Sequence, residues 1–185
     1  PNIGYPLAEG YLFEAVLLNS IVSQDFESFA HAFKQLYEYW INRFGLQPTG
    51  RPLPSITVPN DPEIRGGALD AIPKNIASTN QGFVFYDYEW TSNIPLPSSY
   101  LLYRSLLSLS TKLKPQSLLN LLSLKKSRQI PTINDLIILI INQFCFFDPL
   151  NTYHAAIFEQ FENRFMKFAQ MVHVPENDQT FLELY

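Results

Sequence analysis

Large aromatic side chains recur every three or four residues along one stretch near the amino-terminal end of the chain. They are Phe26, Phe29, Phe33, Tyr37, Trp40 and Phe44. In a helix this spacing places all of them on one face, and such a face normally packs on a hydrophobic core. Ser23 is the predicted N-cap, with Asp25 in the first turn, and Gly45 is a natural stop. The pattern therefore predicts a buried helix over 26–44.

Further helices are predicted on both sides of this segment. A shorter helix before it should form an antiparallel pair with it. After residue 97, helical patterns recur to the end of the domain, with Thr132 and Asp135 spaced as a capping box. Asp148 as N-cap and Pro149 at the first position predict the start of the last helix, which ends before Pro175. The predicted additional helices are about 7–21, 98–113, 117–124, 136–147 and 149–174.

Convincing β-structure is predicted at one place only. Ile76 to Ser78 and Phe83 to Tyr86 are short β-prone runs, and the four residues between them, Thr79-Asn80-Gln81-Gly82, are typical of a tight hairpin. Five prolines between 47 and 62 exclude a helix or a central strand before it. The expected fold class is α+β and mainly helical, a helical bundle around one β-hairpin.

The composition fits one domain. The chain has 185 residues, of which 46% are hydrophobic and 15% aromatic, enough to bury a sizeable core. The expected organisation of 1–185 is a helical pair (7–45), a proline-rich crossing (46–65), a loop and hairpin site (66–90), a helical part (97–174) and a tail (175–185). The chain begins with Pro1 rather than methionine. A start methionine is usually removed before Pro, and a piece of a longer protein would look the same; of these two alternatives we expect a fragment.

Charge and cysteine content narrow the function classes. Thirteen Lys and Arg against 17 Asp and Glu give a net charge of -4, so nucleic acid is not an expected partner. The lone Cys145, among phenylalanines, is expected in the core of a cytoplasmic protein. The apolar run 136–141 is far shorter than the roughly 20 residues that span a bilayer, so no membrane span is expected. The three histidines lack metal-ligand spacing.

Acidic and amide side chains converge around the hairpin. Its geometry should make Asn75, just before the first strand, a neighbour of Asp87, just after the second. Asp70 lies one short loop upstream, and Glu89 follows Asp87 by two residues, on the same side of an extended chain. Oxygen ligands of this kind suit a hard divalent cation. The sequence therefore predicts a ligand or Mg²⁺ site made of Asp70, Asn75, Asp87 and Glu89.

A structural role explains the same residues equally well. Arg104 is the one charged residue in the apolar stretch 100–109, and a buried Arg needs a carboxylate partner. In this interpretation Asp87 or Glu89 pairs with Arg104, and Asp70 and Asn75 support the loop. Trp90 either lines a sugar or nucleotide pocket or packs under the hairpin. Both interpretations predict that Arg104 faces the hairpin.

The run Asp70-Ala71-Ile72-Pro73-Lys74-Asn75, followed by a hairpin and Asp87-Tyr88-Glu89, resembles the catalytic and metal loops of aminoglycoside-phosphotransferase and choline-kinase-like enzymes. The resemblance implies the carboxy-terminal lobe of a kinase-like fold, with Asp70 as the catalytic base and Asn75 and Asp87 as Mg²⁺ ligands. Ala68 stands where that family usually has His, and no glycine-rich phosphate loop precedes it. We therefore do not expect this chain to be a kinase by itself.

A second resemblance covers about 40 residues. The matching residues are 69–75, 85–90, 94–96 and 100–106, which include Asp-Tyr-Glu-Trp and Leu-Tyr-Arg elements. They resemble an uncharacterised region that follows methyltransferase or glycosyltransferase domains in large bacterial surface-polysaccharide proteins. This implies a carboxy-terminal accessory domain whose partner is the transferase domain of the same parent protein.

Three functions follow as expectations. The first is an accessory, non-catalytic or ligand-binding domain of a bacterial methyltransferase or glycosyltransferase acting in surface-polysaccharide biosynthesis. The second is a phosphotransferase remnant that binds Mg²⁺ and nucleotide when a nucleotide-binding lobe is supplied. The third is a structural docking module in which carboxylates anchor Arg104. The substrate and the oligomeric state cannot be inferred from the sequence.

Overall fold

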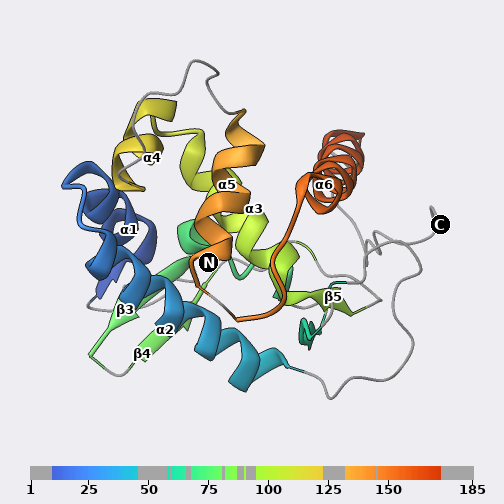
Figure 1. The fold of residues 1–185 in the computed structure, drawn as a ribbon. Helices are drawn as coiled ribbons and strands as arrows, with labels where there is room; N and C mark the ends of the chain where they lie inside the picture. The colour runs from blue at the N-terminus through green and yellow to red at the C-terminus, as the bar shows by residue number, and fades with distance from the viewer. Residues whose placement is uncertain are drawn as a thin grey trace.

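The computed structural model describes residues 10–45, 58, 60–65, 68–80, 82–86, 90, 95–122, 132–144 and 146–171. Within them the protein is α+β and mainly helical, as the sequence predicts. Helices α3 (Ser98–Ser110) and α5 (Ile133–Asn142) occupy the centre, with α1 (Phe13–Val22) and α4 (Pro115–Leu121) at one end and α6 (Thr152–Met171) at the other (Figure 1). Cys145, most of the proline-rich crossing and the 175–185 tail lie outside the described residues.

Helix α2 (Phe26–Phe44) has the predicted bounds, but its cap differs from the prediction. Asp25, not Ser23, is the N-cap, and its side chain accepts a hydrogen bond from the backbone N–H of Ser28 at 3.0 Å. Ser23 instead ends α1, where its backbone N–H and its hydroxyl both donate to the carbonyl of Asn19. Because Gln24 lies between Ser23 and Asp25, the residue that ends α1 and the residue that begins α2 are different.

The aromatic face of α2 is buried, as predicted. Phe29, Phe33 and Trp40 have no exposed surface. The rings of Phe29 and Phe33 stack on each other with centroids 5.4 Å apart. Tyr37 stacks on Phe146, beyond the end of α5, at 3.9 Å. Ring packing of this kind fixes α2 against the segment that links α5 to α6.

The hairpin forms as predicted from β3 (Ile76–Thr79) and β4 (Gly82–Phe85). Gly82 has φ +111°, a conformation open mainly to glycine. The sheet has a third strand, β1 (Gly10–Leu12), which pairs antiparallel with β3 in the order β1-β3-β4. The predicted helix over 7–21 is therefore wrong at its start: residues 10–12 bond to β3, and α1 begins at Phe13.

The described residues also form a second, two-stranded sheet. It joins β2 (Glu63–Ile64) to β5 (Leu96–Pro97), and Gly45 forms an isolated bridge with Ile64. The prediction that the hairpin is the only β-structure is thus wrong. Strands of two or three residues are stabilised by partners distant in sequence, which no local pattern reveals.

The helices after residue 97 form as predicted, with shifted ends. The capping box is present: Thr132 Oγ1 accepts the N–H of Asp135, whose carboxylate accepts the N–H of Thr132. It starts α5 at Ile133. Helix α6 does not begin at Pro149, because Asn142 holds Leu150 outside the helix through two hydrogen bonds. Asn151 caps it instead, accepting the N–H groups of Tyr153 and His154.

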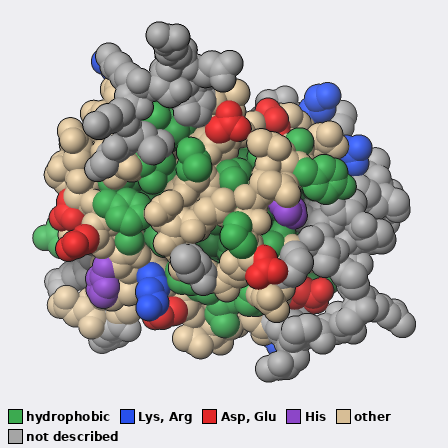
Figure 2. Space-filling view, viewed as in Figure 1, with side chains coloured by type: hydrophobic (Ala, Val, Ile, Leu, Met, Phe, Trp, Pro, Cys, Tyr) green, Lys and Arg blue, Asp and Glu red, His purple; other side chains and the backbone are tan. Residues whose placement is uncertain are grey.

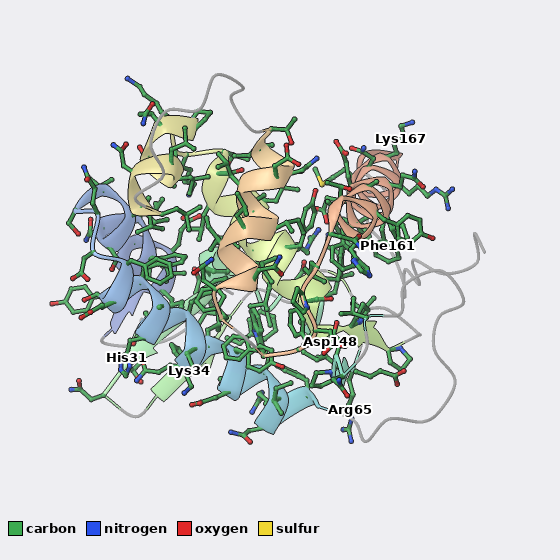
Figure 3. All side chains as sticks on the ribbon, in the orientation of Figure 1. His31, Lys34, Arg65, Asp148, Phe161 and Lys167 are labelled. Carbon is green, nitrogen blue, oxygen red and sulfur yellow. The ribbon has the colours of Figure 1, made fainter. Side chains whose placement is uncertain are left out.

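Helix α6 is amphipathic. Phe158, Phe161 and Phe165 are buried, whereas Lys167 is exposed. Figure 3 shows Phe161 on the inner side of the helix and Lys167 on its outer side.

None of the helices in the described part of the chain is long and apolar enough to cross a membrane. On the face drawn in Figure 2, polar side chains and backbone break up the visible hydrophobic side chains.

Candidate functional site

The candidate site is built on a buried loop that precedes the hairpin. Ala68, Leu69 and Ala71 have no exposed surface, and the 3-10 helix η2 (Pro73–Asn75) follows. The indole N–H of Trp40 donates to the carbonyl of Ala71 at 2.7 Å. The loop is therefore fixed to α2 by a hydrogen bond inside the core.

Asn75 joins this loop to the hairpin. Its side-chain amide donates to the backbone carbonyl of Asp70 at 3.0 Å, and only 5% of Asn75 is exposed. The backbone carbonyl of Asn75 accepts the backbone N–H of Tyr86 at 3.2 Å. The predicted convergence of Asp70, Asn75 and the end of the second strand is thus present as far as Tyr86. Asp87 and Glu89, the other two predicted ligands, lie outside the described residues.

The carboxylate of Asp70 is buried and bound by the protein's own groups. Only 4% of Asp70 is exposed. Oδ2 accepts the backbone N–H of Trp90 at 2.7 Å, and Oδ1 lies 3.6 Å from Nη2 of Arg104. Asp70 therefore connects the loop before the hairpin with the segment after it and with α3.

Arg104 is the centre of this arrangement. Nε donates to the carbonyl of Leu69 at 3.2 Å, and Nη1 forms an ion pair with Oε1 of Glu162 on α6. The guanidinium carbon also lies 4.3 Å from the centre of the Phe165 ring, a cation–π distance. The sequence predicts that Arg104 faces the hairpin; its described contacts are with the loop that precedes the hairpin and with α6. Its described carboxylate partners are Asp70 and Glu162, and pairing with Asp87 or Glu89 concerns residues outside the described part.

Glu162 is a member of this arrangement that was not among the predicted site residues. Its Oε2 accepts the hydroxyl of Tyr100 at 2.7 Å, so that one carboxylate binds two side chains of α3. A signal was present: Glu162 stands at helical spacing between Phe158 and Phe165, an acidic residue on an otherwise aromatic face. Such a residue must meet a cation or a donor when the face is buried.

Burial and charge set the protonation states of the network. Burial by itself lowers the pKa of Arg104, but Tyr100, Glu162 and Asp70 outweigh it, so that the pKa of Arg104 is raised. Burial, reinforced by the Glu162 charge, holds the pKa of Tyr100 well above its usual value. Arg104 is therefore a permanent cation, and Tyr100 a neutral donor. We call Asp70, Tyr100, Arg104 and Glu162 the Arg104 network.

Trp90 belongs to the packing around this network. Its backbone N–H binds Asp70, and its ring meets the Phe165 ring edge to face at 5.7 Å. The indole is half-buried against α6. The two predicted roles are to line a sugar or nucleotide pocket and to pack under the hairpin, and this contact with α6 tests neither of them.

Comparisons with known proteins give no relative. No family model matches this chain, and neither the curated proteins nor the solved structures contain a significant match. The site must be interpreted from its own geometry.

Proposed function

We propose that this chain is an accessory, non-catalytic domain of a larger bacterial transferase protein, in which the Arg104 network stabilises the fold. The observation that carries this proposal is the state of the Asp70 carboxylate. Its two oxygens contact an arginine and a backbone amide, and it is almost fully buried.

This state does not suit a catalytic base. A general base needs hydrogen-bond access to the proton that it removes from a substrate. For Asp70 to reach a substrate, the chain would have to break its contacts with Arg104 and Trp90. Removing one member of a buried charge network leaves another charge uncompensated, which costs about 3 kcal/mol or more. A supporting role for Asp70 requires no such opening.

The proposed parent protein, a methyltransferase or glycosyltransferase of surface-polysaccharide biosynthesis, comes from the sequence resemblance. Several residues that carry the resemblance belong to the Arg104 network or bind its Asp70. Asp70, Asn75 and Trp90 supply the loop side, and Tyr100 and Arg104 supply the α3 side. A structural role therefore accounts for the described part of this motif without a reaction. The proposed partner is the transferase domain of the same protein.

One observation favours phosphotransfer as a second candidate. The Asn75 amide binds the Asp70 carbonyl, and the Asn75 carbonyl binds Tyr86, the residue before Asp87. A proposed Mg²⁺ site would use Asn75 and Asp87, with Asp70 as base, once a nucleotide-binding lobe is added. In this candidate the Asp70–Arg104 contact must open for activity.

Titration of the chain with MgCl₂ and with Mg-ATP, followed by calorimetry and by thermal melting, tests the accessory role. The variants are Asp70→Asn and Asp87→Asn. Glu38→Gln is the control because, among the described residues, the ion pair of Glu38 is an i,i+4 contact with exposed Lys34 at 3.9 Å. The accessory role predicts no saturable binding and a melting temperature lowered by several degrees in Asp70→Asn. Saturable Mg-ATP binding that is lost in Asp87→Asn would overturn it in favour of the kinase-like site.

A further inference from the structure

We draw no further inference here: the strongest candidate, the face of the β1-β3-β4 sheet on which exposed Leu12 and Val84 flank Ala77, is an apolar surface patch, and nothing in the described part of the structure shows what covers it.

Discussion

Arg104 on α3 and Glu162 on α6 form a buried ion pair, although 58 residues separate them in the sequence. Their side chains are only 7% and 13% exposed. The same carboxylate accepts the hydroxyl of Tyr100, and the same guanidinium lies against Phe165. Charge and aromatic contacts together therefore fix the position of α6 on the central helix, in addition to its apolar face.

Replacing Glu162 by Gln should destabilise the fold by about 3 kcal/mol, because Arg104 then loses a buried counter-charge. Urea denaturation measures the loss as a lower midpoint with an unchanged slope. Glu159→Gln on the exposed side of the same helix is the control, and we expect it to stay within about 0.5 kcal/mol of wild type. Equal effects of both substitutions would show that the buried pair contributes nothing specific.

Replacing Arg104 by Lys should cost about 2 kcal/mol even though the charge is kept. A single ammonium cannot reach the Leu69 carbonyl, Asp70 and Glu162 together, and it loses the planar contact with Phe165. Thermal melting and urea denaturation report the change. Arg43→Lys is a matched control, since exposed Arg43 lies over the Phe44 ring at 5.6 Å. If Arg104→Lys lowers the free energy of unfolding no more than Arg43→Lys does, Arg104 does not stabilise the fold through several contacts at once.

Replacing Trp40 by Phe should loosen the site loop as well as the core. The substitution leaves the buried Ala71 carbonyl without its indole donor, a loss of about 1–3 kcal/mol. Amide exchange at Ala71 and Asn75, whose N–H groups close the loop, should become faster. Phe33→Leu removes ring volume from the same face without a hydrogen bond. If it speeds exchange at these two amides equally, the indole bond does not fix the loop.

The dependence of stability on pH should show the sign set by Asp61, whose carboxylate accepts the N–H of Ser99 at the start of α3. Its pKa, raised by burial, is about 6 in the folded chain and 3.8 in the unfolded one, so its contribution to stability is present below pH 4 and lost as the pH rises to 6. Urea denaturation of wild type and Asp61→Asn should be measured at several pH values. As the pH rises, the free energy of unfolding of wild type should fall relative to that of Asp61→Asn by up to about 3 kcal/mol. A difference between the two proteins that is constant with pH, or grows in favour of wild type, would contradict this.

Local patterns in the sequence determined much of the secondary structure. The aromatic spacing gave the bounds of α2, the Thr132–Asp135 pair started α5, and Gly82 closed the hairpin. Each depends on residues within about four positions of one another, so that the energy that selects the structure is already present in the local chain. Asp70 and Asn75 converge for the same reason, since they are five positions apart and Asn75 ends a 3-10 helix.

Tertiary structure alone decided the partners of the buried charges. The sequence indicated that Arg104 needed a carboxylate, but not that Glu162 on α6 and Asp70 would provide it. Likewise, no local signal assigned Asp61 to the start of α3, or residues 10–12 to a strand beside β3. These pairings join residues tens of positions apart, and their energy exists only once the apolar faces have packed and excluded water.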